Sequence, residues 1–157
     1  MQHTIVALME DRPGVLNRVV SLFRRRNFNI DSLAVGHSEK DGMSRMTVVA
    51  NGDNRTMEQI GKQLHKLINV TKVLDLDPAE SVVRELALIK VHATPSVRRD
   101  VIELAKIFRG NIVDVSPESV IIEVTGTSEK IDSLTELLRP FGLKELTRTG
   151  LLAMARG

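Results

Sequence analysis

Cysteine, tryptophan and tyrosine are all missing from this sequence of 157 residues, and aromatic residues make up only 3% of it. Without cysteine the chain has no disulfide, no thiolate zinc site and no cysteine nucleophile. Without tryptophan or tyrosine it lacks the aromatic platforms on which many proteins stack single-stranded nucleic acid. These absences favour a protein of a reducing compartment whose core consists of valine, isoleucine and leucine.

A strong net charge and a long apolar run are missing as well. The 22 basic and 20 acidic residues leave a net charge of +2, whereas a nucleic-acid-binding surface requires a larger basic excess. No apolar segment approaches the roughly 20 residues that span a bilayer. The start, Met1-Gln2-His3-Thr4, has no charged region of the kind that opens a signal peptide. We therefore expect a cytoplasmic protein that binds neither nucleic acid nor a membrane.

The hydrophobic periodicity of the first half predicts the element order β-α-β-β-α-β. The expected segments are a strand at 4–10, a helix whose first residue is Pro13 in the turn Asp11-Arg12-Pro13-Gly14 and which ends at Arg24-Arg25-Arg26, strands at 28–38 and 44–50, a helix with Met57, Ile60, Leu64, Leu67 and Ile68 on its apolar face, and a strand at 70–76. This order is the ferredoxin-like arrangement.

The same order follows in the second half, after a polar break at residues 77–81. The expected segments are a strand at 84–93, a helix opened by Pro95 and closed by Gly110, a hairpin of 111–115 and 120–125, a helix marked by Ile131, Leu134 and Leu138, and a strand at 143–147. We therefore predict an α+β protein of two tandem ferredoxin-like βαββαβ domains with antiparallel sheets, at residues 1–77 and 83–157. Domains of about 75 residues have marginal cores, so we expect a homodimer.

No arrangement typical of catalysis or metal binding is visible. His3, His37, His65 and His92 lie on separate predicted elements without metal-ligand spacing, and no Gly-x-Ser-x-Gly or phosphate-loop motif occurs. We accordingly assign no catalytic and no metal-binding residues. The triple Arg24-Arg25-Arg26 suits the negative end of a helix dipole, and we interpret it as a solvated helix end in preference to a phosphate site.

The segment from Glu10 to Leu16 is more informative, because a strand ends, the chain turns and a helix begins with unpaired amide groups. Such a helix start suits a carboxylate, and Gly14 permits close approach to the backbone. Asp11 either caps the helix or faces an ammonium group. The same residues also make a simple turn into a helix, and this segment alone does not separate the two interpretations.

This turn resembles the signature of ACT domains, the βαββαβ modules that bind amino acids and regulate metabolic enzymes. A longer set of segments resembles one family with such a domain: residues 22–35, 44–47, 59 and 62–67 in the first half, and 84–86, 108–115, 125–127 and 155–157 in the second. Together they make the whole chain similar to the small regulatory subunits of acetohydroxyacid synthase, also called acetolactate synthase.

The resemblance implies a regulatory chain with no catalytic site and no cofactor of its own. In this family the small subunit binds a large catalytic subunit that holds thiamine diphosphate, Mg2+ and FAD. It raises the activity of that subunit and makes it sensitive to valine, in some members also to leucine or isoleucine. The enzyme joins two pyruvates, or pyruvate and 2-oxobutyrate, in the first common step of branched-chain amino-acid synthesis.

By the same resemblance, L-valine lies between the ACT domains of two protomers. The matching residues are Asp11, Pro13, Gly14, Val15 and Leu16 in the helix-start loop of one protomer, and Asn29 and Ile30 at the second strand of the other. We add Val35 as an apolar neighbour. Many members carry asparagine at the position of Asp11, so the site of this chain differs in charge. We assign amino-acid sensing to the first domain, and assembly with and activation of the catalytic subunit to the second.

Three other functions are compatible with parts of the pattern. A stand-alone ACT-repeat sensor acting on another partner shares the fold and the ligand class, and co-purification with a large thiamine-diphosphate enzyme would separate the two. An enzyme on a ferredoxin-like scaffold requires an exposed catalytic residue near a phosphate-binding loop, which the sequence does not offer. A nucleic-acid-binding protein is disfavoured by the charge balance and the scarcity of aromatic residues.

Overall fold

The computed structural model describes residues 1–157, which form two compact units. The first consists of Met1–Val83 together with Leu151–Gly157, and the second of Arg84–Gly150. None of the helices has the length and apolar character required to cross a bilayer. The predicted α+β class is confirmed, with one antiparallel sheet in each unit.

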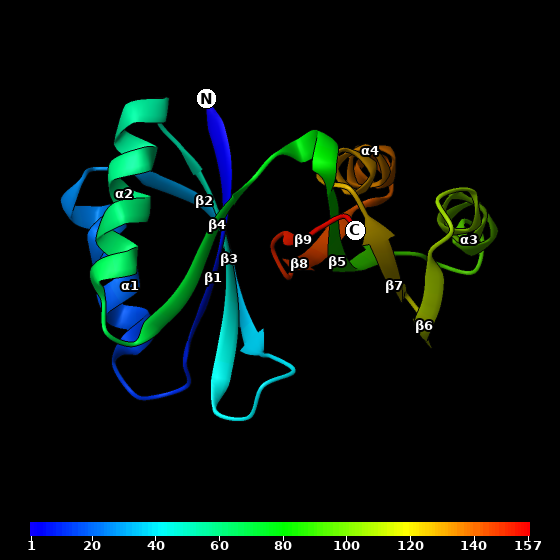
Figure 1. Cartoon of the computed structure of the whole chain (residues 1–157). Coiled ribbons are helices and arrows are strands. Elements are labelled where there is room, and N and C mark those ends of the chain that lie inside the picture. Colours follow the sequence, from blue (N-terminus) through cyan, green and yellow to red (C-terminus); the bar gives the residue numbers. More distant parts are fainter. The chain divides into compact units, whose positions relative to one another are not determined.

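The first unit has the predicted order β-α-β-β-α-β. Its elements are β1 (Gln2–Glu10), α1 (Val15–Arg25), β2 (Asn29–His37), β3 (Met43–Asn51), α2 (Asn54–Lys66), β4 (Val70–Leu76) and the 3-10 turn η1 (Pro78–Glu80), joined by the late strand β9 (Leu152–Ala155). The four-stranded sheet has the order β2-β3-β1-β4. The helices α1 and α2 lie side by side on one face of this sheet (Figure 1).

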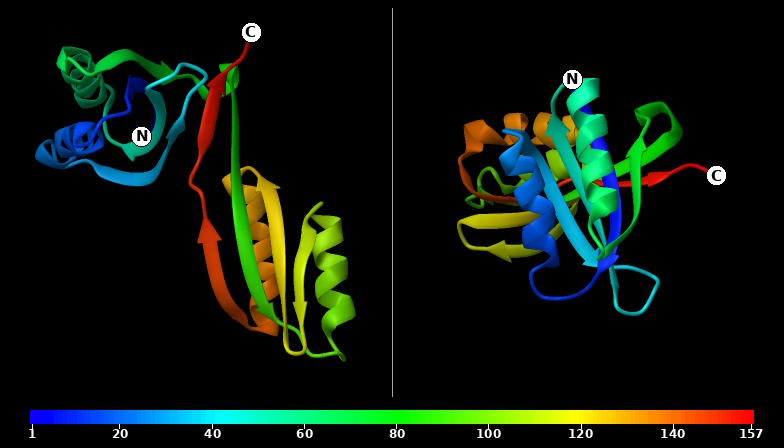
Figure 2. Two further views of the ribbon diagram at one scale, coloured as in Figure 1. Left: turned by 90° about the horizontal axis from the view of Figure 1, so that it is seen from below. Right: turned by 60° about the vertical axis from the view of Figure 1, so that its left-hand side comes forward.

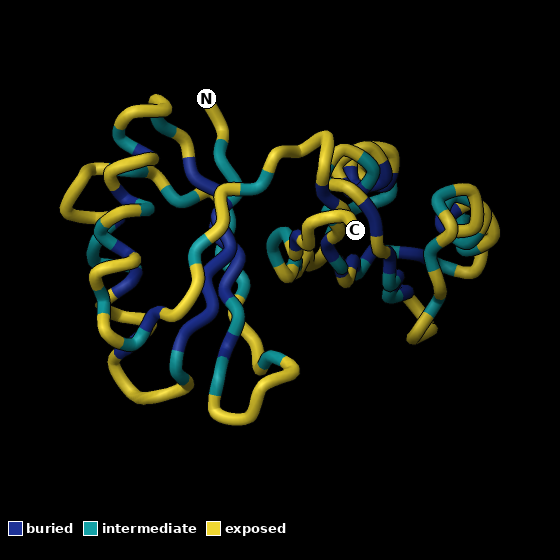
Figure 3. Tube along the Cα trace, in the orientation of Figure 1, coloured by how far each residue is buried: buried dark blue, intermediate teal, exposed yellow.

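The core of the first unit lies between the sheet and its two helices. Alternate residues of β1 and β3 meet apolar residues at helical spacing in α1 and α2. The buried members are Ile5, Ala7, Met9, Val15, Val19, Phe23, Met46, Val48, Ala50, Met57, Ile60, Leu64 and Val70. The central strands are accordingly buried along most of their length, whereas the loops at both ends are exposed (Figure 3).

The second unit repeats this plan with its own core. Its elements are β5 (Ser81–His92, which begins in the first unit), α3 (Arg98–Ile107), β6 (Asn111–Ser116), β7 (Ser119–Gly126), α4 (Ser128–Leu138), the 3-10 turn η2 (Arg139–Phe141) and β8 (Leu143–Arg148). The strand order β6-β7-β5-β8 matches that of the first unit. The helices α3 and α4 pack together and, with β5 and β7, enclose the second core (Figure 2).

The two units share local structural details, in their helix endings and strand registers, that are not apparent from the sequence. α1 and α3 both end in a left-handed residue, Asn27 and Arg109, each with φ 58°. In both, the next amide donates back across five residues, from Phe28 to Phe23 and from Gly110 to Ala105, which is the Schellman ending. Arg109 lies 82 positions after Asn27, and the register shifts at 30/32 and 112/114 have the same spacing. The units are therefore an internal structural repeat.

The structure divides the chain differently from the expected 1–77 and 83–157. Residues 151–157, expected in the second domain, lie in the first unit. The Arg156 amide donates to the Glu80 carbonyl (2.8 Å), and the Leu151 amide donates to the Ser32 hydroxyl (2.8 Å). These contacts return the end of the chain to the first unit.

Three local expectations were wrong. Pro13 is not the first helical residue, because α1 begins at Val15 after Gly14 takes the left-handed conformation. Likewise α3 begins at Arg98 and not at Pro95. Ile68 is not on the apolar face of α2, since the helix ends at Lys66 and the Ile68 residue is 88% exposed.

Candidate functional site

The helix-start loop lies between the end of β1 and the first turn of α1. Gly14 precedes the helix with φ 85°, and no side chain caps the helix. The Val15 amide donates to the Arg12 carbonyl (3.3 Å) and the Arg18 amide to the Gly14 carbonyl (3.1 Å), while the amides of Leu16 and Asn17 have no hydrogen-bond partner. These two N–H groups and the positive end of the helix dipole offer a site for a carboxylate.

Asp11 does not cap α1. Its backbone amide donates to the Gly42 carbonyl (2.8 Å), which attaches the loop to the hairpin between β2 and β3. Its carboxylate oxygen Oδ2 lies 3.2 Å from Nδ1 of His37, at the end of β2. Both side chains are exposed to solvent. Asp11 therefore adds negative charge beside the loop, and His37 joins the site as a residue that the sequence did not single out.

A polar network supports the loop from the other side. The Arg12 guanidinium lies 3.1 Å from the Glu10 carboxylate, which also accepts from the Asn69 side-chain amide (3.1 Å). The Asn69 side-chain oxygen accepts from Arg18 (2.9 Å), and its backbone carbonyl accepts from the Glu10 amide (2.8 Å). Asn69, just before β4, thus holds both the end of β1 and the first turns of α1. Sequence spacing gave no signal for this contact, because 59 positions separate Asn69 from Glu10.

Asn29 and Ile30, the site residues predicted from the second strand, lie at the opposite end of the sheet. Asn29 pairs with Asn51, and Asn51 pairs with Gln2 at the start of β1. The loop follows Glu10 at the end of β1, eight residue steps away, which corresponds to roughly 27 Å. Within one chain, Asn29 and Ile30 are therefore too far from the helix-start loop to form one site with it. Within the chain the Asn29 side-chain amide donates to Asp31 (2.9 Å), and Ile30 packs against the core.

Two apolar side chains near the loop are partly exposed to solvent. Leu16 is 39% exposed and Val35 43% exposed. Val35 follows Leu33 by two positions on β2, so it points to the same face of the sheet as that core-facing residue. The Val15 side chain is buried in the core, which leaves only its backbone for a ligand. Because β2 is an edge strand, Val35 lies along an open border of the unit.

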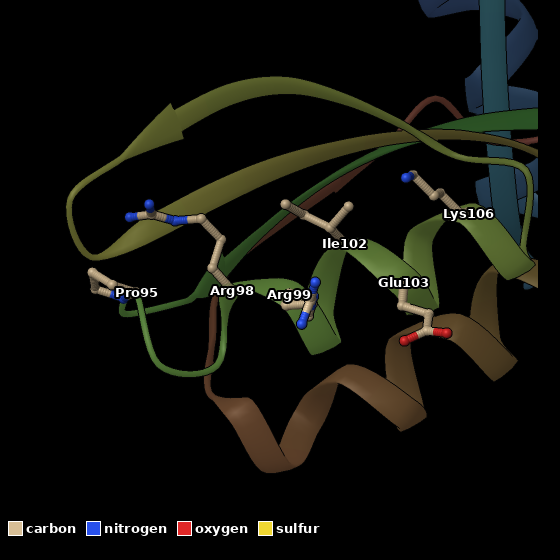
Figure 4. Close-up of a pocket in the computed structure, with 6 residues that line it drawn as sticks. All are labelled: Pro95, Arg98, Arg99, Ile102, Glu103 and Lys106. Atoms are coloured by element: carbon tan, nitrogen blue, oxygen red, sulfur yellow. The ribbon is translucent and has the colours of Figure 1, made fainter.

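A different hollow lies along the exposed side of α3 in the second unit (Figure 4). Its volume is about 560 Å3, and Pro95, Arg98, Arg99, Ile102, Glu103 and Lys106 line it. The Arg98 guanidinium donates to the carbonyls of Ser116 and Pro117, both at 3.1 Å. This arrangement fixes the turn between β6 and β7 to the start of α3.

The structure contains no group of three or more His, Cys, Asp or Glu side chains that could hold a metal ion. The four histidines lie on four different elements, β1, β2, α2 and β5. The unpaired amides at the start of α1 suit binding of a small anionic group.

Comparison with protein families agrees with this arrangement. Residues 5–72 match the model of the AHAS small subunit-like ACT domain, and residues 84–157 match the model of the small subunit of acetolactate synthase. The two matches together cover nearly the whole chain.

Individual proteins are similar over the full length. A probable acetolactate synthase small subunit from Methanothermobacter thermautotrophicus is 59% identical over 99% of this chain and 93% of its own length. An acetolactate synthase small subunit from Mycobacterium bovis is 51% identical over 99% of this chain and 92% of its own. The crystal structure of the acetolactate synthase small subunit from Thermotoga maritima superposes with a TM-score of 0.94 at 43% identity, covering 100% of this chain and 98% of that one. The chain therefore belongs to the family of acetolactate synthase small subunits, the regulatory and non-catalytic subunits of that enzyme, and its first unit is an ACT domain.

Proposed function

We propose that this chain binds L-valine, with leucine and isoleucine as related effectors, at an interface between two ACT units. The bound amino acid reduces the activity of a large catalytic subunit that the chain otherwise activates. Thiamine diphosphate, Mg2+ and FAD belong to that catalytic partner, in keeping with the resemblance of the sequence. The first unit senses the effector, and the second contributes most to assembly and activation.

The observation that carries the proposal is the position of the two halves of the site at opposite ends of one sheet. The loop lies near the end of β2, where Asp11 contacts His37, whereas Asn29 and Ile30 begin β2. When two copies pair their β2 edges antiparallel about a two-fold axis, the end of one β2 meets the start of the other. This pairing brings the loop of one protomer to Asn29 and Ile30 of the partner subunit.

The chemistry of the assembled site suits a free branched-chain amino acid. The ligand carboxylate accepts from the unpaired amides of Leu16 and Asn17. Its ammonium group donates to the side-chain oxygen of Asn29 of the partner subunit and to backbone carbonyls. Its branched side chain contacts the partly exposed Leu16 and Val35. A ligand held by two protomers binds the assembled dimer better than separate chains, so it shifts quaternary structure by that difference in affinity.

Isothermal titration of the purified chain with L-valine, with L-lysine as a control ligand, tests this proposal. The decisive variant is Gly14→Asp, which places a carboxylate beside the anion site, where no atom occupies the space of a new Cβ. We expect valine affinity to fall at least tenfold. Gly14→Asn is the matched control, because asparagine has nearly the same size, also tolerates φ 85° and carries no charge.

Reconstitution with the large subunit gives the functional readout. Gly14→Asp should retain activation of acetolactate formation and lose inhibition by valine, while Gly14→Asn should retain both. A Gly14→Asp variant with normal valine inhibition would overturn the placement of the effector at this loop.

A further inference from the structure

A small apolar hollow lies on the face of the first unit's sheet that is opposite its helices. Ile5, Ala7 and Met9 of β1 belong to the helix-side core, so Val6 points to the other face. The hollow there has a volume of about 280 Å3 and is lined by Val6 of β1, Leu74 and Leu76 of β4, and Met154 of β9, with small residues of β9 beside it. Its size is near the lower limit of ligand pockets, which suits a solute of few atoms.

One end of this hollow is charged. Arg45 of β3 and Glu39 of the β2–β3 turn both line it, and they are its charged residues. The Arg45 guanidinium donates to both carboxylate oxygens of Glu39, at 2.6 Å and 3.3 Å. Hydrogen bonding by Arg45 lowers the pKa of Glu39 to about 2, so this carboxylate is ionised at every physiological pH. A fixed cation and a fixed anion thus lie side by side next to an apolar surface.

We propose that this hollow is a second ligand site of the first unit and that it takes a free α-amino acid with an apolar side chain. The ligand carboxylate accepts from Arg45, its ammonium group donates to Glu39, and its side chain lies between Val6, Leu74 and Met154. An α-amino acid fits because its two opposite charges are attached to the same carbon atom, as close together as the two side chains that face them.

Binding is favourable because Arg45 and Glu39 exchange their contact with each other for contacts with the two charged groups of the ligand. The Arg45–Glu39 pair is exposed, with 36% and 61% of the two side chains accessible, and such pairs contribute little to stability. When the ligand enters, one exposed ion pair opens and two charge-assisted hydrogen-bonding contacts form. At the same time the ligand covers apolar surface of Leu74 and Met154, which are 39% and 68% exposed.

The hollow is separate from the helix-start loop. Val6 pairs with Thr47 and Leu74 in the middle of the sheet, and the loop lies beyond the end of β1 on the helix side. The hollow is lined by one protomer alone, whereas the effector site proposed above needs two. This inference therefore does not rest on the proposed valine site.

Methyl NMR of the full chain tests it, with the Leu74 and Met154 methyl groups as probes. We expect millimolar L-leucine to shift both resonances saturably. 4-Methylpentanoate lacks the ammonium group and 3-methylbutylamine lacks the carboxylate, so each should bind at least tenfold more weakly. Equal affinity for all three compounds, or no saturable shift with L-leucine, would overturn the proposal.

Variants of the charged pair complete the test. Arg45→Gln and Glu39→Gln should each weaken leucine binding at the Leu74 and Met154 probes at least tenfold; Glu39 is an exposed turn residue whose replacement does not disturb the core. Arg139→Gln removes an exposed ion pair of similar geometry in the second unit, 2.8 Å from Glu136, and should leave binding unchanged. Gly14→Asp should also leave these probes responsive, which distinguishes this site from the loop. Retention of binding by both Arg45→Gln and Glu39→Gln would contradict it.

Discussion

At the scale of single residues, the site depends on contacts between positions far apart in the sequence. The helix-start loop was predicted from Pro13 and Gly14, because a turn residue and a residue tolerant of positive φ stand directly before a helical pattern. The roles of His37 and Asn69 could not be predicted in the same way. Each reaches the loop only after the sheet has formed, through strand register that no local pattern specifies.

The Glu39 carboxyl group gives a direct residue-scale prediction. Hydrogen bonds from Arg45 lower its pKa from 4.5 to about 2. The ion pair is therefore fully present above pH 4.5 and is lost as the pH falls toward 2. Because Glu39 is exposed, the effect on overall stability is small, and the side-chain titration itself is the measurement. A carboxyl NMR titration should give a midpoint near 2 that returns toward 4.5 in Arg45→Met. An unchanged midpoint in that variant would show that Arg45 is not the cause.

At the scale of elements, the hydrophobic periodicity predicted eight of the structure's strands and all four of its α-helices, and it placed helix starts less well. Pro13 and Pro95 both precede their helices by two or three residues, because left-handed or turn residues intervene. The strand β9 was not predicted at all. Its four residues carry little pattern, and its partner β5 begins 71 positions earlier, so only long-range pairing defines it.

The start of α2 supplies an element-scale prediction. The Asp53 carboxylate accepts hydrogen bonds from the Thr56 amide and hydroxyl, both at 2.7 Å, and these bonds lower its pKa. Asp53→Ala should reduce the free energy of unfolding and lower the denaturation midpoint, because the first turn of α2 loses its cap. Asp41→Ala is the control, since Asp41 is an exposed turn residue without a hydrogen bond or ion pair. Equal denaturation midpoints for the two variants would contradict the assigned cap.

An ion-pair network around the buried Glu85 carboxylate joins three elements of the second unit. Glu85 of β5 is 4% exposed and accepts from Nε of Arg148 of β8 at 2.6 Å. Arg148 also donates to Asp132 of α4 at 2.6 Å. Burial lowers the pKa of Arg148, but its bonds to Asp132 and Glu85 outweigh this effect and raise the pKa overall.

Replacement of Arg148 by methionine leaves the Glu85 carboxylate buried without its cation. We expect Arg148→Met to destabilise the second unit by about 3–5 kcal/mol in urea unfolding. The double variant Glu85→Gln/Arg148→Met should recover part of this loss, because it removes the unpaired charge. Arg139→Met, which removes an exposed pair, should cost less than about 1 kcal/mol. A loss that small for Arg148→Met would show that Glu85 finds another partner.

At the scale of the whole molecule, the internal repeat explains why the order of the elements was easier to predict than the boundary between the two units. Corresponding turns and strand irregularities of the two units lie 82 positions apart. The apolar pattern of each unit predicts its strands and helices without reference to the other unit. The return of Leu151–Gly157 to the first unit depends on single backbone contacts with Ser32 and Glu80, which leave no periodic signal in the sequence.

The assembly of two chains is the last prediction, and it follows from the open border of the first unit. If valine bridges two β2 edges, saturating valine must strengthen the dimer, by about 2.7 kcal/mol at a concentration 100 times its dissociation constant when only the dimer binds. Sedimentation velocity at micromolar concentration should show a dimer whose dissociation constant falls with valine. Val35→Lys places a charge on this border and should weaken both dimer and valine binding, whereas Ile107→Lys alters an apolar residue of α3 that is 69% exposed and should change neither. Saturable valine binding by a chain that stays monomeric would show that a single protomer completes the site. If each of two protomers contributed half of the site, the ligand could not bind without bringing the two protomers together.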